Sequence, residues 1–472
     1  MNAIMNVTAR LRSFFSVQDM TQGEPMTGLV KFAVPLLIGN LAQQLYNTVD
    51  SIVVGQYIGD TALAAVGTSG PILNLLLVLF MGVSTGASIL SAQFFGAKDR
   101  PTLNKVVGSA ISLTVACGLL MMVVGYFASP ALIAMVRPPE NVAIGAVAYL
   151  QIIFLGILGC ALYNILSGVL RGLGDSVFPL IFLVLASLLN IVLDVLFVAT
   201  FGMGIAGVAW ATIIAQAISG VLCFVRLCTM RDVCDVNRHT LRPDGHLTKK
   251  LCLLGLPAGI TQAIFSMSAI VVQSLTNSMG EAVMAASTAV MRVDGFAMMP
   301  NFTLGTAATT FAGQNIGARR VDRLKQGTKD LMGLALGTSA VLVLCILLFG
   351  HQLLNMFTNT PLTLEIGIRA LRWLALGYIC FAVTQVLQGN MRGAGETMLP
   401  MWISIICTVL LRMPLAYLLA FLTRSADYPN GHPDAIFGSL LFSWVMGMVM
   451  SVIVYRHGRW KRRLPAELQE AE

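Results

Sequence analysis

Charged side chains are scarce in this chain. Asp, Glu, Lys and Arg make up 11% of its 472 residues, whereas they supply about a quarter of a typical soluble domain. Hydrophobic residues make up 56%, and the mean hydropathy is +0.79. This composition excludes an ordinary soluble domain and predicts a protein that lies in a membrane for most of its length.

The chain also lacks several motifs of common catalytic and cofactor sites. It has no GxxxxGK[ST] loop to hold the phosphates of ATP and no HExxH zinc motif, and its nine Cys include no CxxC pair. Patches of interleaved basic and aromatic residues are absent, so we expect no nucleic-acid partner. We expect neither an enzyme nor an ATP-driven pump, and no cofactor or metal centre. The five His all lie in predicted connections or tails: His239, His246, His351, His432 and His457.

Twelve segments are long and apolar enough to cross a bilayer, which takes about 20 helical residues. The first of them is expected to act as the insertion signal, because the residues before it contain no apolar core typical of a signal peptide. The predicted spans are 32–54, 62–86, 106–128, 145–168, 177–200, 204–226, 251–275, 284–311, 331–350, 369–390, 398–422 and 435–455.

The distribution of basic residues predicts the orientation. Of the 30 Lys and Arg, 24 lie in the two tails and in alternate connections, and 4 lie in the opposite connections. Basic residues collect on the cytoplasmic side, so both termini are predicted to be cytoplasmic in a multi-pass protein of the plasma membrane. The predicted parts are an N-terminal tail (1–28), a first lobe (29–226), a linker (227–250), a second lobe (251–455) and a C-terminal tail (456–472).

The chain contains an internal duplication. The segment RGLGDS at 171–176 returns as RGAGET at 392–397, and other matches share this repeat offset, which carries Arg171 onto Arg392. Each repeat holds six spans, an even number, so both enter the membrane from the same side. The prediction is an all-α polytopic membrane protein, with twelve transmembrane helices in two six-helix lobes related by a parallel pseudo-twofold repeat, and we expect a monomer.

Five ionisable residues fall well inside the predicted spans: Asp50, Asp194, Arg292, Asp294 and Arg412. An ionisable group in the hydrocarbon layer costs a few kcal/mol, so such residues are rare and usually functional. Arg412 is a candidate partner for Asp294, and this group has either a structural or a gating role. Arg292 lies two residues from Asp294 and is expected on a different helical face.

Polar side chains follow one face of each of three spans in the first lobe, at positions i, i+3 or i+4, and i+7. Polar groups that face lipid are costly, so these stripes are expected to converge on a hydrated cavity. The stripes are Gln43, Asn47 and Asp50 on span one, Ser187, Asn190 and Asp194 on span five, and Thr212, Gln216 and Ser219 on span six.

Two carboxylates near amide and hydroxyl oxygens suit a hard monovalent cation, and carboxylates close together also tend to hold a proton. The coupling ion is therefore either H⁺ or Na⁺, with Na⁺ possible at Asp50 and Asp194. A purely structural role stays open: Asp194 as a packing link to a neighbouring helix, and Asn190 and Thr212 as caps of helix kinks.

The duplication provides an internal control. At the repeat offset, Asp50 corresponds to Val271 and Asp194 to Leu415, so the second lobe lacks the acidic pair. Duplication preserves a scaffold, and these carboxylates are not part of it. Ion coupling is therefore predicted in the first lobe. Span seven carries a neutral stripe suited to hydrogen-bonding an organic substrate, including Gln262 and Ser266.

Several segments spread over nearly the whole chain resemble the multidrug and toxic compound extrusion (MATE) family. Each segment alone is weakly specific, but the set is specific. They are "YNTVDSIVVGQYIGDTALAAVG", "NIVLDVLF", "GMGIAGVAWATIIAQ", "RGLGDS", "AVMRVDGFAMMP", "GQNIGA" and "QGNMRGAGET". The resemblance implies a two-lobed antiporter that expels cationic or amphipathic drugs in exchange for H⁺ or Na⁺. The alternative is a lipid-linked oligosaccharide flippase of the same superfamily.

The chain is more similar to the DNA-damage-inducible and archaeal members than to the norfloxacin-extruding members. The latter use acidic residues on spans seven and ten, where this chain has none and carries neutral residues around Phe381. The resemblance implies a cation site at Asp50, Asn190, Asp194 and Thr212. It also implies that Gln43 and Asn164 line the cavity, to which the polar stripes add Asn47 and Gln216.

Overall fold

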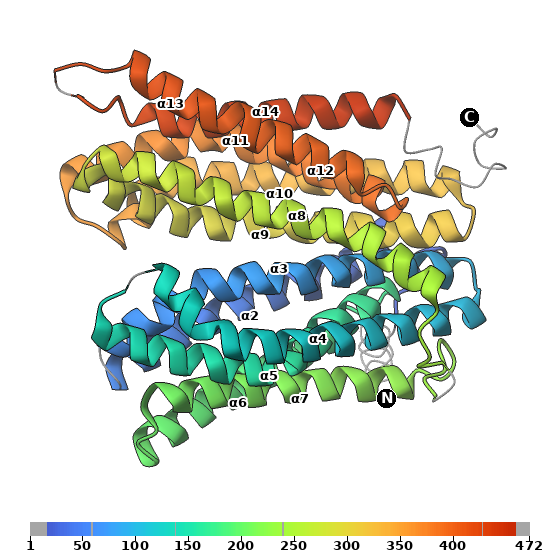
Figure 1. The fold of residues 1–472 in the computed structure, drawn as a ribbon. Helices are drawn as coiled ribbons and strands as arrows, with labels where there is room; N and C mark the ends of the chain where they lie inside the picture. The colour runs from blue at the N-terminus through green and yellow to red at the C-terminus, as the bar shows by residue number, and fades with distance from the viewer. Residues whose placement is uncertain (1–16, 58–59, 137, 238–239, 427, 459–472) are drawn as a thin grey trace, which may run out of the picture. The chain divides into compact units, whose positions relative to one another are not determined.

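The computed structural model describes residues 17–57, 60–136, 138–237, 240–426 and 428–458. Within its helices, the side chains of residues 46–57, 60–63, 75, 76, 79 and 141 are outside the description. Throughout the described residues the regular secondary structure is helical (Figure 1). The predicted all-helical class is confirmed.

The helices of the first repeat are α2 to α7, with a short π-helical segment η1, and those of the second repeat are α8 to α14, with a π-helical segment η2. The first set is α2 (Pro25–Tyr57), α3 (Asp60–Gly96), α4 (Arg100–Val136), α5 (Glu140–Gly172), α6 (Val177–Val195), η1 (Leu196–Thr200) and α7 (Gly204–Thr229). The second set is α8 (Gly245–Ser278), α9 (Glu281–Gly317), α10 (Val321–Asn355), α11 (Pro361–Gly393), α12 (Met398–Ile405), η2 (Ile406–Arg412), α13 (Met413–Leu422) and α14 (Asp434–Arg456).

Eleven helices or composite helices are long and apolar enough to cross a membrane within the described part of the chain. Predicted span five corresponds to α6 with η1, and predicted span eleven to α12, η2 and α13. Predicted span two falls within α3, which has 37 residues. The prediction of a multi-pass helical membrane protein is confirmed.

The helix bounds reproduce the duplication. α3 and α9 begin at Asp60 and Glu281, and α5 and α11 end at Gly172 and Gly393, so both pairs are separated by the same offset as Arg171 and Arg392. The turns repeat too: the backbone has a positive φ of 88° at Gly174 and 86° at Gly395. The two halves diverge near their ends, where the connection 423–433 of the second repeat replaces the shorter connection 201–203 of the first.

The repeated acidic residue after each of these turns caps the following helix. Asp175 Oδ1 accepts a hydrogen bond from the backbone N–H of Phe178 at 3.2 Å, and Glu396 Oε1 accepts one from Leu399 at 3.2 Å. In the first repeat Arg226 of α7 adds an ion pair to Asp175 at 2.9 Å. Burial raises the pKa of Asp175, and the neighbouring Arg226 opposes that rise. These acids belong to the shared scaffold.

The chain forms two compact units. In the first unit, α5 packs against α3, α4 and α7; in the second, its counterpart α11 packs against α9, α10 and α14. The first unit holds Val30–Gly259, and the second holds Thr21–Leu29 and the chain from Ile260 onward. One division therefore falls inside α8, so the beginning of this helix belongs to the first unit and the rest to the second. The core of the first unit accordingly includes Leu247, Leu251 and Leu254 of α8.

Within the first unit, α3 and α8 cross at a pair of glycines. A Cβ atom on Gly82 would lie 2.6 Å from the carbonyl oxygen of Gly255, and one on Gly255 would lie 2.7 Å from that of Gly82. Both helices carry a G-x-x-x-G pattern here, Gly82 with Gly86 and Gly255 with Gly259. Small residues at this spacing let membrane helices approach at backbone distance.

Candidate functional site

The buried acid of the first unit lies on α6. Asp194 and Asn190 are one helical turn apart on the same face, and both are fully buried, with 0% of each residue exposed. Asp194 is the one charged residue in α6, whose other residues are largely aliphatic or aromatic. A buried carboxylate in such a helix is costly and indicates a functional role.

A π-helical segment begins two residues after Asp194. This segment, η1, begins at Leu196, and the second unit has a longer π-helical segment, η2, that ends at Arg412. Segments of π-helix inside α-helices are rare and occur frequently at functional sites. Each repeat therefore carries a π-helical segment next to an intramembrane ionisable residue.

The hydroxyls predicted to line the site on α7 donate to carbonyls of their own helix. The Thr212 hydroxyl donates to the carbonyl of Val208 at 2.9 Å, and the Ser219 hydroxyl donates to that of Ala215 at 3.2 Å and also contacts that of Phe182 on α6 at 3.5 Å. α7 packs against α6, which carries Asp194. Such donation leaves the lone pairs of a hydroxyl oxygen available to accept. Gln216, one turn beyond Thr212, is half-buried.

Asp50 and Asn47 lie on α2, but their side chains are outside the described part of the structure. The backbone still gives their height. Gly39 of α2 faces Leu180 of α6, since a Cβ on Gly39 would lie 3.4 Å from Leu180 Cδ1. Successive spans alternate in direction, and the three helices α3, α4 and α5 lie between α2 and α6 in the chain. α2 and α6 therefore run in the same direction. Counting at about 1.5 Å per residue from this contact, Asp50 is about 16 Å along α2.

By the same count, Asn190 is about 15 Å and Asp194 about 21 Å beyond Leu180 on α6. The level of Asp50 therefore falls between those of Asn190 and Asp194. Among the side chains that the structure describes, no group of three His, Cys, Asp or Glu residues is placed to hold a metal ion. A cation bound here would depend on amide and hydroxyl oxygens as well as carboxylates.

The other predicted cavity residues differ in exposure. Asn164 of α5 is half-buried and its side chain donates to the carbonyl of Cys160 at 2.8 Å. Gln43 of α2 and Gln262 of α8 are exposed within their units. The Ser266 hydroxyl donates to the carbonyl of Gln262 at 3.2 Å. Gln262 and Ser266 lie in the second unit and Gln43 in the first.

Ser84 belongs to a G-x-S-x-G sequence, residues 82–86, of the kind that carries the nucleophile in many serine hydrolases. That nucleophile requires a sharp turn between a strand and a helix. Here the sequence lies in the middle of α3, and the Ser84 hydroxyl donates to the carbonyl of Asn164 at 2.6 Å. Its glycines serve the crossing with α8, so Ser84 is a packing residue.

In the second unit, Asp294 and Arg412 are the predicted ion pair. Arg412 interacts electrostatically with Asp294. The Tyr378 hydroxyl also interacts with Asp294, a partner that the sequence did not indicate. Arg292 is exposed and lies on another face of α9, as its spacing from Asp294 predicts.

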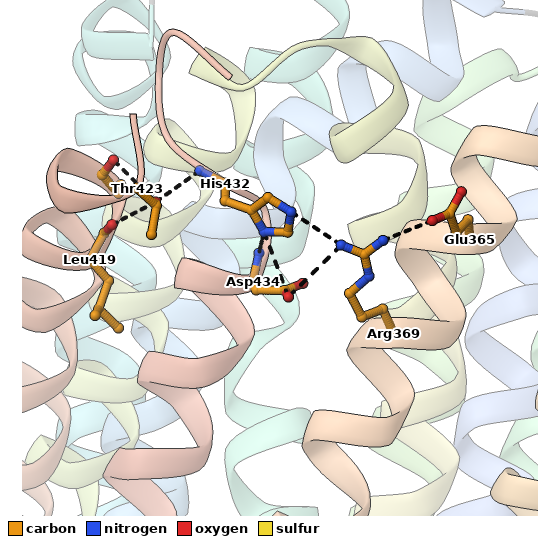
Figure 2. A network of polar contacts seen from close by, with 7 residues as sticks. Glu365, Arg369, Leu419, Thr423, His432 and Asp434 are labelled. Atoms are coloured by element: carbon orange, nitrogen blue, oxygen red, sulfur yellow. Dashed lines mark hydrogen bonds and ion pairs between the residues drawn. The ribbon is translucent and has the colours of Figure 1, made fainter. Parts of the chain in front are cut away.

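A polar network at the end of the second unit also has no signal in the sequence. Figure 2 shows Arg369 of α11 between Glu365, at 2.8 Å, and His432, at 3.1 Å. The backbone N–H of His432 donates to the Thr423 hydroxyl oxygen at 2.9 Å. Asp434 lies 3.9 Å from Arg369. The network thus holds the connection 423–433, which has no counterpart of its length in the first repeat, against α11.

The profile of the MatE family matches the chain twice, over residues 35–196 and 257–418. The chain belongs to the MatE family. The two matches coincide with the two repeats, and the family consists of transporters, so the expectation of a protein that is not an enzyme is confirmed. The MATE resemblance of the sequence motifs is confirmed as well.

Relatives of this MatE protein extend over nearly its whole length. It is 33% identical over 419 residues to the probable multidrug resistance protein YoeA of Bacillus subtilis, covering 87% of this chain and 90% of the relative. It is 24% identical over 440 residues to the probable multidrug resistance protein NorM of Thermotoga maritima, covering 92% and 93%.

Solved structures share the fold of this MatE protein over nearly its whole length. An outward-facing multidrug resistance MATE family transporter of the MOP superfamily matches with a TM-score of 0.86 and 25% identity, over 96% of this chain and 99% of that one. A MOP superfamily transporter from Pyrococcus furiosus, described as having a binding pocket of reverse polarity that suggests a different function, matches with a TM-score of 0.85 and 25% identity, over 97% and 99%.

Proposed function

We propose that this protein is a secondary active multidrug exporter that exchanges cationic or amphipathic organic compounds for H⁺ or Na⁺. The observation that carries the proposal is Asp194, a fully buried carboxylate in an otherwise apolar helix. Its counterpart in the second repeat is Leu415. The names of the relatives, which are described as multidrug resistance proteins, support the class of substrate.

The proposed coupling site consists of Asp50, Asn190, Asp194 and Thr212. Carboxylate, amide and hydroxyl oxygens are ligands that a hard cation prefers, and the same carboxylates accept protons. The backbone heights of Asp50 and Asp194 differ by about 5 Å, which supports a shared site. Asn47, Gln43, Asn164 and Gln216 are proposed to line the substrate cavity of the first repeat, and Gln262 and Ser266 of the second repeat are proposed to hydrogen-bond the organic substrate.

The proposed mechanism is alternating access. An ion shifts the equilibrium between two openings only as far as its affinities for the two states differ, so binding at Asp50 and Asp194 must favour the state that releases the drug. One cation moving inward contributes about 2.3 kcal/mol per 100 mV of membrane potential. That free energy corresponds to a drug gradient of about fiftyfold.

The orientation and environment follow from the basic residues. We propose a bacterial plasma membrane protein with both termini cytoplasmic, because 24 of the 30 Lys and Arg lie in the tails and the connections on that side. The partners are small organic substrates and the bilayer, and a monomer contains every residue of the proposed site.

A lipid-linked oligosaccharide flippase is the alternative. Such a flippase needs several cationic side chains to hold a pyrophosphate, and only Arg292 and Arg412 lie deep in predicted spans. Arg292 is exposed, and the charge of Arg412 is balanced by Asp294. The charges of this chain therefore favour a cationic or neutral cargo.

Efflux of ethidium, a cationic dye, from membrane vesicles under imposed pH or Na⁺ gradients tests the proposal. We expect Asp50→Asn and Asp194→Asn to lose gradient-driven efflux at normal membrane abundance. Asp232→Asn, which removes an exposed carboxylate in a connection, is the matched control and should resemble the parent. Full efflux with unchanged ion dependence in both site variants would rule out the site. Transport confined to a lipid-linked sugar would establish the flippase instead.

A further inference from the structure

Three polar side chains of the second unit meet deep among its apolar helices: Asp294 of α9, Tyr378 of α11 and Arg412 of η2. Tyr378 and Arg412 both interact with the Asp294 carboxylate. Each residue lies in the middle third of its helix or composite span. The cluster therefore lies at a depth where ionisable groups are rare and usually functional.

The hydrogen bonds of this cluster are incomplete. Asp294 Oδ1, the Tyr378 hydroxyl oxygen and Arg412 Nε are buried, and none of them reaches hydrogen-bond geometry with another described residue. Tyr378 is nevertheless held firmly, since it is 0% exposed and its ring centroid lies 5.7 Å from that of Trp444. Buried polar atoms without partners are uncommon in native proteins and call for an explanation.

The duplication indicates that the cluster is functional rather than part of the scaffold. Both repeats share their helix bounds and turns, yet all three polar residues are confined to the second repeat. At the repeat offset the first repeat has an aliphatic residue at each of these three positions. The counterparts of Asp294, Tyr378 and Arg412 are Leu73, Ile157 and Ile191.

The chemistry of the cluster selects its occupant. Arg412 carries its charge at every physiological pH, so a metal cation beside Asp294 would be repelled by a fixed positive neighbour. A proton meets no such barrier, because it bonds to the carboxylate oxygen and removes the negative charge. We propose that this cluster is a second proton-exchange site, at which Asp294 takes up and releases one proton in each transport cycle.

The inference rests on the proposed ion-coupled antiport and adds a carboxylate of the second repeat to it. In the ionised state, Asp294 attracts Arg412 and accepts from the Tyr378 hydroxyl. When a proton from one aqueous side bonds to Asp294, the attraction to Arg412 is lost, and it returns when the proton leaves to the other side. Arg412 ends a π-helical segment, a local widening that can shift its register, so the proton changes how strongly η2 is held to α9.

Few other charges act on this carboxylate. Arg292, two residues away, is exposed on another face of α9. α10, which packs against α9 and α11, and α14, which packs against α11 and η2, carry their charged residues near their ends, and Cys345 of α10 lies further inside. The residues near the ends are Asp322, Arg323, Lys325, Lys329, Asp330 and His351 on α10, and Asp434, Tyr455 and Arg456 on α14. α11, which packs against α9, carries Cys380 near Tyr378 and has Glu365, Arg369, Arg372 and Arg392 closer to its ends.

Proton release on ethidium binding, measured with a pH indicator in weak buffer, tests the inference on the purified full-length protein. The chain has only three carboxylates well inside its predicted spans, Asp50, Asp194 and Asp294. We expect the double variant Asp50→Asn/Asp194→Asn to release fewer protons than the parent but still to release some. Adding Asp294→Asn should abolish the remainder, whereas Asp232→Asn should change nothing.

The outcomes separate this inference from the proposed first-repeat site. A double variant that releases no protons, or a parent that releases none, overturns the inference. A double variant equal to the parent, together with loss of release in Asp294→Asn alone, overturns the first-repeat site and supports the inference. If Asp294→Asn does not fold, the triple variant Asp294→Leu/Tyr378→Ile/Arg412→Ile, which installs the residues of the first repeat, replaces it.

A purely structural ion pair gives a different result in that triple variant. An apolar cluster of similar volume often replaces a buried ion pair at no cost in stability, so the triple variant should fold in either case. With a structural pair, its ethidium efflux would keep the pH dependence of the parent, which would refute proton exchange. With an exchanging Asp294, its efflux is expected to lose part of that pH dependence.

Discussion

The crossing of α3 and α8 gives the sharpest prediction of stability. Gly82→Ala places a methyl group 2.6 Å from the carbonyl oxygen of Gly255 and 3.0 Å from the Cα of Gly259. Ordinary van der Waals contact begins at 3.4 Å. Both obstructing atoms belong to the backbone, so no side chain can rotate away. The helices must separate by 0.8 Å, the difference between 3.4 Å and 2.6 Å.

The size of the effect follows from this separation. A gap of roughly 0.5 to 1 Å forfeits about a quarter to a half of the dispersion energy of the atoms that it parts, and overpacking a well-packed contact typically costs about 1 to 3 kcal/mol. An alanine in open space has the opposite effect, a gain of about 0.5 to 1 kcal/mol over glycine inside a helix. Gly67, also on α3, has nothing within 4 Å of its Cβ position, so Gly67→Ala is the matched control.

The measurement is reversible unfolding of the purified protein in mixed micelles of dodecyl sulfate and a mild detergent, followed by Trp fluorescence. We expect Gly82→Ala to lower the free energy of unfolding by about 1 to 3 kcal/mol and Gly67→Ala to leave it unchanged or higher. Equal stability of the two variants would refute the argument that backbone contact at Gly82 holds α8 to α3.

Two further predictions concern polar contacts outside the membrane core. Arg226→Gln leaves the buried Asp175 carboxylate without its ion pair. Burial already raises the folded pKa of Asp175, and loss of the ion pair raises it further above the unfolded value. The variant therefore loses about 2 kcal/mol of unfolding free energy at pH values above the unfolded pKa of about 4, where Asp175 tends to ionise. Below that pH the loss disappears. Melting temperatures should therefore fall more at neutral than at acid pH, and a loss independent of pH would contradict this. Arg369→Gln should speed hydrogen exchange in the connection 423–433, measured by mass spectrometry. The reason is that the Arg369 guanidinium joins Glu365 of α11 to His432 in this connection (Figure 2). Arg372→Gln, at an exposed position on the same helix, should leave that exchange unchanged, and equal exchange in both variants would contradict the role of Arg369.

Much of the fold could be predicted because local rules decide it. Apolar segments long enough to span a bilayer must be helical, since lipid offers no partner to the backbone. The return of the segment 171–176 at 392–397 predicted equivalent helix ends, and α5 and α11 end at the equivalent residues Gly172 and Gly393. The π-helical segments could not be predicted, because one extra residue in a helical turn leaves no mark in an apolar sequence.

The candidate site was predictable only in part. Asp194 and Asn190 stand out because a polar residue in an apolar helix is conspicuous, and their spacing places them on one face. Tyr378 did not stand out, because a lone aromatic hydroxyl in a span is usually part of the core. Its relation to Asp294 depends on α9 packing against α11, and contacts between distant segments are not written in local periodicity.

The sequence by itself determined the membrane environment, the helical class, the duplication and the positions where the repeats differ in charge. These properties depend on composition, on the length of apolar segments and on comparison of one half with the other. Only the tertiary structure decided that α8 is divided between two units after Gly259, that Gly82 touches Gly255, and that Asp294, Tyr378 and Arg412 share one cluster. The reason is physical: burial and partnership depend on which helix faces approach, and that choice is made by packing over the whole unit.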